Sequence, residues 1–341
     1  MQTYDLHQAA RLGLLANVPA EVLSSKELFV RNAAGSTPLH AIARHGGLYL
    51  LPASVLTADN LSLRNDSGYT PLHHAAESGQ LDKIPRHLLN PVLLGLASNS
   101  GYTVYHVAAA SGHLDQIPAA LLTAEVILTK NHLGNTALHE AAEAGTLDKV
   151  PPRFLTPDHL LERNLGGETV YHVAAFNGHL DQIPPALLTA DALLARTTSG
   201  DTAFHAAAIA GHLEQIPAAL LTPAHLAVAS KTGFTAIHAA AESGQLDKIP
   251  RPSLTAELML TRNDNGDTPL HAAAYEGHLD QVPISLLTTE NLNVRNYDGM
   301  SIGRTALTRG FIEQIPPQVR PRHRGALALF LEKIGASKPP F

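Results

Sequence analysis

Residues 134–166 read GNTALHEAAEAGTLDKVPPRFLTPDHLLERNLG, and the same pattern returns every 33 residues along the chain. Each copy has a Thr-x-x-His element, a glycine five residues before the histidine and a proline twelve residues after it. The period is free of insertions and deletions at the histidines, which are His40, His73, His106, His139, His172, His205, His238 and His271. A unit of this length cannot bury its own apolar face, so the copies are expected to stack as a solenoid.

The composition excludes several classes of protein. Of the 341 residues, 45 % are hydrophobic and 5 % are aromatic, and the chain has no Cys and no Trp. Without cysteine there is no disulfide, thiol nucleophile or thiolate zinc site. The first residues lack the basic region and apolar core of a signal peptide, and no apolar stretch is long enough to span a membrane. We therefore expect a cytoplasmic protein that makes no membrane contact.

The charge is distributed unevenly. The formal net charge is −6, but residues 304–341 carry seven Lys or Arg and two Asp or Glu, so the rest of the chain carries −11. An acidic scaffold attracts nucleic acid poorly, and no nucleic-acid partner is expected. Arg320, Arg322 and Arg324 could contact an acidic partner, although a solvated end of the chain is the simpler interpretation.

Each repeat is expected to open with one regular helix. Thr136 precedes an apolar run and is typical of an N-cap, whose hydroxyl accepts a hydrogen bond from the first turn. His139 stands at the third helical position, where a side chain can reach back to the cap. Gly145 marks the end of the helix, as expected for a residue in the left-handed conformation.

The second half of each repeat is expected to be broken. The Leu-Asp-Lys-Val-Pro segment at residues 147–151 favours a turn, because proline lacks an N–H and disfavours helix in the residue before it. Thr156 then resembles another N-cap, which predicts a short helix from Pro157 to Glu162.

These motifs resemble the ankyrin repeat. TPLHHAA at residues 70–76 and TPLHAAA at 268–274 match its signature, and Gly-His-Leu at 112–114 matches the segment that follows its first helix. The Ile-Pro-x-x-Leu-Leu-Thr segment departs from the usual second helix and is similar to a variant that we associate with bacterial proteins. The resemblance implies an all-α, ankyrin-type helical solenoid with loop tips, made of eight full repeats and partial capping ends.

The expected organisation is a single domain over residues 1–341. Residues 1–33 form an N-terminal partial repeat, residues 34–297 the eight full repeats, and residues 298–341 a C-terminal capping repeat and helix. The apolar stretch at 325–335 is expected to be a helix that covers the last repeat.

The twenty histidines do not point to chemistry. Nine occupy the capping slot if His7 is included, and four more take the slot after a helix-ending glycine, namely His113, His179, His212 and His278. His139-Glu140-Ala-Ala-Glu143 lacks the second histidine of a helical zinc motif, and the glycines mark repeats rather than a phosphate loop. A residue that recurs in every repeat serves stacking, whereas an active site needs a unique constellation. We predict no catalytic, cofactor-binding or metal-binding residue, and no enzymatic activity.

The variable positions are the better guide to function. By resemblance to the family, the residue after each loop glycine and the two residues before each helix-ending glycine line the concave face and the loop tips. Aromatic and acidic side chains there could form an interface with a protein that has a basic surface. The predicted partner-binding residues are Tyr69, Tyr102, Glu143, Glu168, Phe176, Asp201, Phe234 and Tyr275. An alternative for the first two is that the tyrosines pack on each other across adjacent loops.

The predicted function is that of a monomeric, non-enzymatic scaffold that binds a partner protein without a cofactor. Two alternatives stay open. One is a structural module that assembles with copies of itself, and the other is a ligand-binding or enzymatic groove.

Overall fold

A computed structural model describes residues 4–320. The chain divides into two compact units, Met1–Ala192 and Leu193–Phe341, here called unit 1 and unit 2. Between residues 4 and 320 the regular elements are helices, and β-structure is limited to two isolated bridges. The predicted all-α fold is therefore confirmed. A single domain over the whole chain stays a prediction, and the predicted helix at 325–335 lies outside the described residues.

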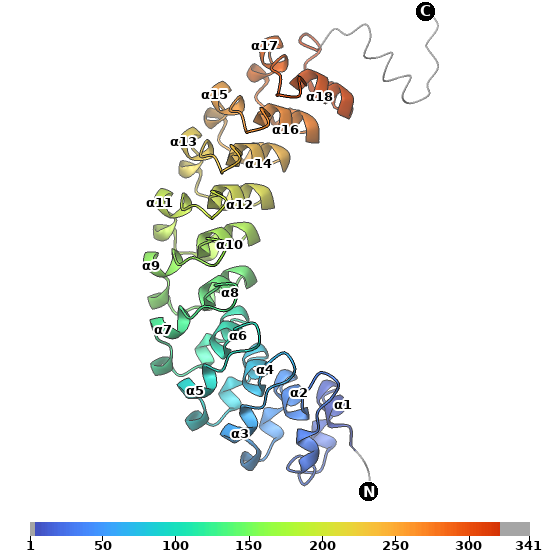
Figure 1. The fold of residues 1–341 in the computed structure, drawn as a ribbon, viewed down its shortest axis with the longest axis vertical. Helices are drawn as coiled ribbons and strands as arrows, with labels where there is room; N and C mark the ends of the chain where they lie inside the picture. Colours follow the sequence, from blue (N-terminus) through green and yellow to red (C-terminus); the bar gives the residue numbers. More distant parts are fainter. Residues whose placement is uncertain (1–3, 321–341) are drawn as a thin grey trace, which may run out of the picture. The chain divides into compact units, whose positions relative to one another are not determined.

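Each repeat contributes one longer helix. In unit 1 these helices are α1 (Leu6–Arg11), α2 (Pro38–Arg44), α4 (Pro71–Glu77), α6 (Val104–Ala110), α8 (Ala137–Ala144) and α10 (Val170–Asn177). In unit 2 they are α12 (Ala203–Ala210), α14 (Ala236–Glu242), α16 (Pro269–Glu276) and α18 (Ile302–Arg309). Within each unit, consecutive longer helices pack side by side (Figure 1).

The helix α8 shows why the sequence begins and ends a helix where it does. The Thr136 side chain accepts a hydrogen bond from the backbone of His139, and Nδ1 of His139 accepts one from the Thr136 N–H at 3.2 Å. This reciprocal capping box satisfies two donors that a helix start leaves unpaired. At the other end Gly145 has φ 72°, a left-handed conformation that glycine adopts without steric cost.

The second half of each repeat is broken, as predicted. It consists of two 3₁₀ turns followed by a short α-helix. Ile84 is extended (φ −80°, ψ 134°) before Pro85, which separates the two 3₁₀ turns of its repeat. The helix α9 (Pro157–Leu160) ends two residues earlier than predicted. The reason is that the Glu162 N–H bonds to the carbonyl of His159, three residues back, which takes the chain out of α geometry.

The 3₁₀ turns of unit 1 are η1 (Leu15–Asn17), η2 (Lys26–Phe29), η3 (Leu48–Leu50), η4 (Ala53–Val55), η5 (Leu81–Lys83), η6 (Arg86–Leu88), η7 (Leu114–Gln116), η8 (Ala119–Leu121), η9 (Leu147–Lys149), η10 (Pro152–Phe154), η11 (Leu180–Gln182) and η12 (Pro185–Leu187). Its other short α-helices are α3 (Ala58–Leu61), α5 (Pro91–Leu94) and α7 (Ala124–Ile127). The unit boundary falls within α11 (Ala190–Leu193).

Unit 2 has the same sequence of elements. Its 3₁₀ turns are η13 (Leu213–Gln215), η14 (Ala218–Leu220), η15 (Leu246–Lys248), η16 (Arg251–Ser253), η17 (Leu279–Gln281), η18 (Ile284–Leu286) and η19 (Ile312–Gln314). Its short α-helices are α13 (Pro223–Leu226), α15 (Ala256–Met259) and α17 (Thr289–Leu292).

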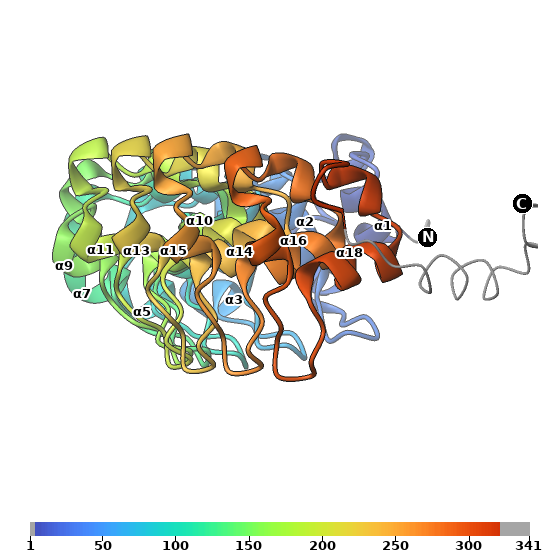
Figure 2. The same ribbon diagram turned by 90° about the horizontal axis from the view of Figure 1, so that it is seen from above.

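Loops between the repeats project to one side of each unit (Figure 2). Neighbouring loops are tied to each other, since the N–H of His132 donates to the carbonyl of Ser100 and the N–H of Leu165 to that of Leu133, both at 3.0 Å. A side chain at Gly134 would place its Cβ 2.7 Å from the Leu165 nitrogen, so the close approach of two loops requires glycine there. The loop tips therefore have fixed backbone positions.

The core lies between the longer helices and the 3₁₀ turns. Alanine pairs such as Ala141 and Ala142 are fully buried, which lets adjacent helices approach closely. Leucines at the start of the first 3₁₀ turn, such as Leu147, are also fully buried and supply apolar area for the stack.

The N-terminal end departs from one prediction. His7 does not cap its helix: Asp5 takes that role by accepting from the N–H of Gln8 at 3.0 Å, while Nε2 of His7 lies 3.3 Å from the carbonyl of Val30. The reason is that Tyr4 occupies the threonine slot, so the cap moves to the next short polar side chain.

The C-terminal end behaves as a repeat with altered markers. The side chain of Ser301 accepts a hydrogen bond from the N–H of Arg304 and so caps α18. Arg320 forms an ion pair with Glu313 at 2.8 Å, whereas Arg322 and Arg324 lie outside the described residues.

Candidate partner-binding surface

The capping histidines belong to the interior rather than to an exposed site. His106 is buried; its Nδ1 accepts from the Thr103 N–H at 3.2 Å, and its Nε2 donates to the Asn135 carbonyl at 3.1 Å. Burial lowers the pKa of this histidine, and it lowers the pKa of His73 and of His139 to about 4. All eight Thr-x-x-His elements form this capping box, which confirms the structural interpretation of those histidines.

Two predicted residues of unit 1, Tyr69 and Tyr102, lie half-buried in the loops before α4 and α6. The Tyr69 ring lies 5.0 Å from that of His73 and stacks on His74 at 5.9 Å, and the Tyr102 ring lies 5.8 Å from that of His106. Within the described part of the chain, the ring contacts of each tyrosine are with histidines of its own repeat. The alternative that the two tyrosines stack on each other is therefore not what the structure has.

Between these tyrosines and the next loop lies a buried carboxylate, Glu140 of α8, which is only 6 % exposed. Its Oε1 accepts hydrogen bonds from the side-chain amides of Asn131 and Asn135, both at 3.0 Å, and its side chain is also hydrogen-bonded to that of Tyr102. The amide of Asn164 donates in turn to Asn135 at 3.0 Å, so the network continues into the next loop. Tyr69, Tyr102 and Glu140 are called the tyrosine cluster below.

The tyrosine cluster has the electrostatics of a fixed, negatively biased spot. Burial raises the pKa of Glu140, and the Asn135 amide opposes that rise. Burial, and then the charge of Glu140, raise the pKa of Tyr102 to about 12; the same two causes raise the pKa of Tyr69. Both tyrosines therefore keep their hydroxyl protons at neutral pH and can donate hydrogen bonds to a partner.

The remaining predicted residues of unit 1 are exposed. Glu143, near the end of α8, lies close enough for its charge to raise the pKa of Tyr102. Glu168 accepts a hydrogen bond from the Asn164 amide at 2.8 Å, which links it to the network around the tyrosine cluster. Phe176, in the last turn of α10, is 53 % exposed. A large aromatic ring at that exposure is available to a partner.

Unit 2 contains an open groove of about 830 Å³ between its loops and the exposed sides of α14, α16 and α18. Two predicted residues, Phe234 and Tyr275, line it together. Five carboxylates also line it, and we call this site the acidic groove: Glu242, Asp264, Asp267, Glu276 and Asp298.

The carboxylates of the acidic groove have few partners. Asp267 accepts a hydrogen bond from the Asn296 amide at 2.7 Å. Burial raises the pKa of Glu242, and the charges of Glu276 and Asp267 add to the rise. Among residues 4–320, no lysine or arginine forms an ion pair with any of the five.

Arg309 is the one arginine among the residues that line the acidic groove. It is engaged with Tyr275: its guanidinium carbon lies 3.8 Å from the centre of the Tyr275 ring, and its Nε donates to the Tyr275 carbonyl at 3.1 Å. The arginine holds the ring in place while the ring stays 50 % exposed.

Asp201 has a different position from the other predicted residues of unit 2. It is half-buried, its N–H donates to the hydroxyl of Thr197 at 3.1 Å, and its carbonyl accepts from the Thr197 N–H at 2.8 Å. Its backbone therefore closes a loop, and Asp201 is not among the residues that line the acidic groove.

Comparison with known families identifies the repeat. A model of three ankyrin repeats matches residues 6–91 and 171–250, and a single-repeat model matches residues 265–297. Together the matches cover more than half of the chain. The chain belongs to the ankyrin-repeat family. No curated protein matches it.

Ankyrin repeats are generally protein–protein interaction modules, and this ankyrin chain presents aromatic and acidic side chains on fixed loops and helix ends. Of residues 4–320, no helix is both long and apolar enough to cross a membrane. Within the same residues, no three His, Asp or Glu side chains converge in a way that would hold a metal ion.

Sequence reasoning missed four residues of this surface: Glu140, His74, Glu242 and Arg309. A signal for Glu140 was available, because the same slot in the repeats on either side holds valine, Val107 and Val173. A carboxylate at a slot that is otherwise apolar indicates either a polar network or a binding site. The role of Arg309 needed the structure, since nothing in its sequence neighbourhood indicates contact with a ring 34 residues earlier.

Proposed function

We propose that this ankyrin-repeat protein is a non-enzymatic scaffold that binds a partner protein through its loop tips and the exposed ends of its longer helices. The contact residues are Tyr69, Tyr102, Glu143, Glu168, Phe176, Asp201, Phe234 and Tyr275, the surface that the sequence predicts as the concave face. In this proposal the protein acts as a cytoplasmic monomer, needs no cofactor, and binds neither nucleic acid nor membranes.

The observation that carries the proposal is the acidic groove. An aromatic ring that is half exposed and held by Arg309 has the character of an interface anchor, because little conformational entropy is lost when it is buried. Five carboxylates without an ion-pair partner surround it. Such a site complements a partner surface that carries lysine or arginine around an apolar centre.

The test uses calorimetry with the partner recovered from the native host. Tyr275→Ala is expected to weaken binding by at least about 2 kcal/mol, because it removes a central anchor. Glu276→Gln is expected to weaken binding less, and to reduce the dependence of the dissociation constant on salt, because rim charges act mainly through screened attraction.

Matched controls lie elsewhere in unit 2. Ile284→Ala removes a large apolar side chain that is 75 % exposed on η18, and Glu290→Gln removes an exposed carboxylate on α17. Both are expected to leave affinity within about 0.5 kcal/mol of the parent. Equal losses in the control and groove variants would refute the proposed surface.

The two alternatives have distinct signatures. A self-assembling module would run as a multimer in size-exclusion chromatography with light scattering, and the Tyr275→Ala variant would dissociate it. A ligand groove would bind a small molecule in the absence of any partner protein. Either result in place of partner binding would replace the proposed function.

A further inference from the structure

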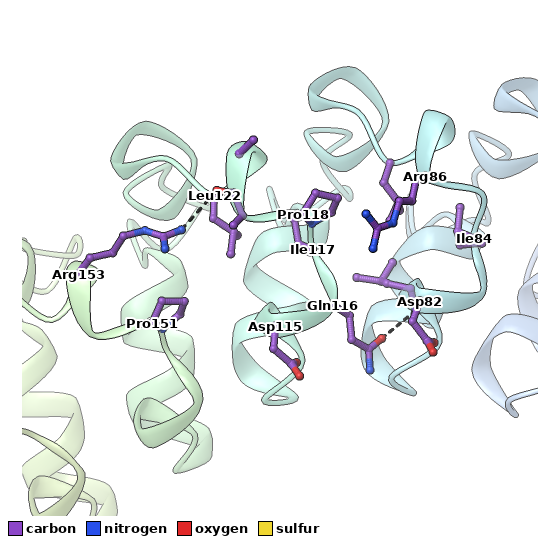
Figure 3. A pocket seen from close by; sticks show the side chains of 14 residues that line it. Asp82, Ile84, Arg86, Asp115, Gln116, Ile117, Pro118, Leu122, Pro151 and Arg153 are labelled. Carbon is purple, nitrogen blue, oxygen red and sulfur yellow. Dashed lines mark hydrogen bonds between the residues drawn. The ribbon is translucent and has the colours of Figure 1, made fainter.

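Unit 1 has a second groove, of about 800 Å³, built from the 3₁₀ turns and the prolines between them rather than from loop tips (Figure 3). It extends from η6 across η8 to η10, so three consecutive repeats contribute to it. None of the eight predicted partner-binding residues lines it. It is therefore a separate surface from the one in the proposed function.

The sequence explains why a groove forms there. The two residues after the repeat proline are Arg86 and His87 in one repeat, Ala119 and Ala120 in the next, and Pro152 and Arg153 in the third. The middle repeat thus has two methyl side chains where its neighbours have large ones. We call the resulting depression, with Pro118 and the two alanines as its floor, the arginine groove.

Both arginines are directed toward the segment that begins at Pro118, one from each side (Figure 3). Both are exposed, and among residues 4–320 neither forms an ion pair with a carboxylate. Arg153 donates to the backbone carbonyl of Ala119 at 3.3 Å and lies 4.7 Å from the centre of the Phe154 ring. These contacts orient its guanidinium without neutralising its charge.

The scaffold does not require arginine at either position. The Arg86 slot holds Ala119 in the next repeat, and the Arg153 slot holds Ala120 one repeat earlier. Two cations that stacking does not need, at the two ends of one groove, fit a role in recognition. Of the carboxylates that line the groove, Asp82 is paired with Lys83 at 2.6 Å, which leaves Asp115 as an exposed negative charge near the floor.

We propose that the arginine groove binds an extended acidic segment of a protein. One carboxylate of the segment pairs with Arg86 and a second with Arg153, while small or apolar residues between them cover Pro118 and the two alanines. Guanidinium groups recognise carboxylates by paired hydrogen bonds, which makes arginine suited to this role. The two arginines are two repeats apart, about 20 Å at usual helix spacings, and an extended chain spans that distance in about six residues.

The probe is a fluorescein-labelled peptide with the core Glu-Ala-Leu-Pro-Ala-Ala-Glu, titrated with the full chain and followed by fluorescence anisotropy at low and moderate salt. Arg86→Gln and Arg153→Gln are each expected to weaken binding by about fivefold, because each removes one charge-assisted contact. Asp115→Asn is expected to tighten binding by about twofold, because it removes a repulsive charge.

Two controls make the sign of the effect decisive. Arg251→Gln changes the arginine that occupies the Arg86 slot in unit 2, outside this groove, and is expected to leave peptide affinity unchanged. A peptide with lysine in place of both glutamates is expected not to bind. Circular dichroism confirms that each variant is folded, which is expected because all the altered side chains are exposed.

Several outcomes would overturn the inference. They are unchanged affinity in both Arg86→Gln and Arg153→Gln, equal binding of the lysine peptide, or weaker binding in Asp115→Asn. Tighter binding of a single-stranded oligonucleotide than of the glutamate peptide would assign the arginines to phosphate instead. None of these results bears on the acidic groove of unit 2, so the proposed function would stand.

Discussion

Nε2 of His139 lies 3.2 Å from the carbonyl oxygen of Glu168, a residue 29 positions later in the chain. Nδ1 of the same imidazole accepts the N–H of Thr136, which starts the helix of its own repeat. One neutral side chain therefore caps a helix and fixes the loop of the following repeat. This double use explains why the histidine keeps the strict period of 33 residues.

The first prediction concerns that double role. His139→Ala is expected to lower the free energy of unfolding by about 2 kcal/mol, because it removes the cap and leaves the carbonyl of Glu168 without its donor. The matched control is His132→Ala, at an exposed loop position, which is expected to stay within about 0.5 kcal/mol of the parent. Urea melts followed by circular dichroism measure both, and equal losses would contradict the assignment.

The second prediction is a loss of stability in acid. Burial lowers the folded pKa of His40, His73, His139 and His238 from 6.5 to about 4. Between these values the unfolded chain binds more protons than the folded chain, so stability is fully present above about pH 6.5 and falls as the pH drops toward 4. Each histidine is expected to contribute on the order of 1 kcal/mol or more to this loss.

Urea melts at several pH values test the acid prediction, and proton NMR titration of the histidines tests its cause. The exposed His132 is expected to titrate near the ordinary value for histidine and serves as an internal reference. Capping histidines that titrate at or above that reference would contradict the account.

The third prediction uses glutamines that connect repeats. Oε1 of Gln116 accepts from the Leu81 N–H at 3.0 Å, and its Nε2 donates to the Gly79 carbonyl at 3.1 Å. Gln116→Ala is expected to cost about 1–2 kcal/mol, because it removes two bonds to the preceding repeat.

The converse change is a gain. Lys149 occupies the glutamine slot one repeat later, where its side chain passes close to Gly112. Lys149→Gln is expected to add the same pair of bonds to the turn at Gly112 and to stabilise unit 1 by about 1 kcal/mol. Thermal melts would show a higher midpoint in Lys149→Gln, and a lower one would disprove the pairing.

The fourth prediction concerns the tyrosine cluster. Glu140→Ala leaves the buried amides of Asn131 and Asn135 without their acceptor and is expected to cost about 1–3 kcal/mol. Glu143→Ala, three residues later on the same helix but exposed, is the control and is expected to change stability by less than about 0.5 kcal/mol. Chemical denaturation distinguishes the two, and a neutral Glu140→Ala would show that the network contributes no stability.

The sequence predicts the fold well because the repeat constrains it many times over. Thr136, His139 and Gly145 each mark a boundary by local chemistry, and the structure has the helix where they predict it. Pro85 likewise predicts the break in the second segment. The cap at His7 failed because an altered neighbour, Tyr4, removed the threonine on which the pattern depends.

The candidate surface was predictable only in part. Phe234 and Tyr275 were found because they vary within a strict scaffold, and the structure brings both to the acidic groove. The contact of Arg309 with Tyr275 and the position of the arginine groove depend on how side chains of neighbouring repeats lie against each other. Such contacts leave no periodic signal in the sequence, because each occurs once.

Site-specific photo-cross-linking in the native host tests the central claim most directly. A photoreactive amino acid is placed at Tyr275 in one variant and at Ile284 in another, both exposed positions of unit 2. The account predicts that a partner protein is cross-linked from position 275 and not from position 284, with the attachment mapped by mass spectrometry to a lysine- or arginine-rich segment of the partner. Cross-linking of the partner from position 284 alone would contradict it.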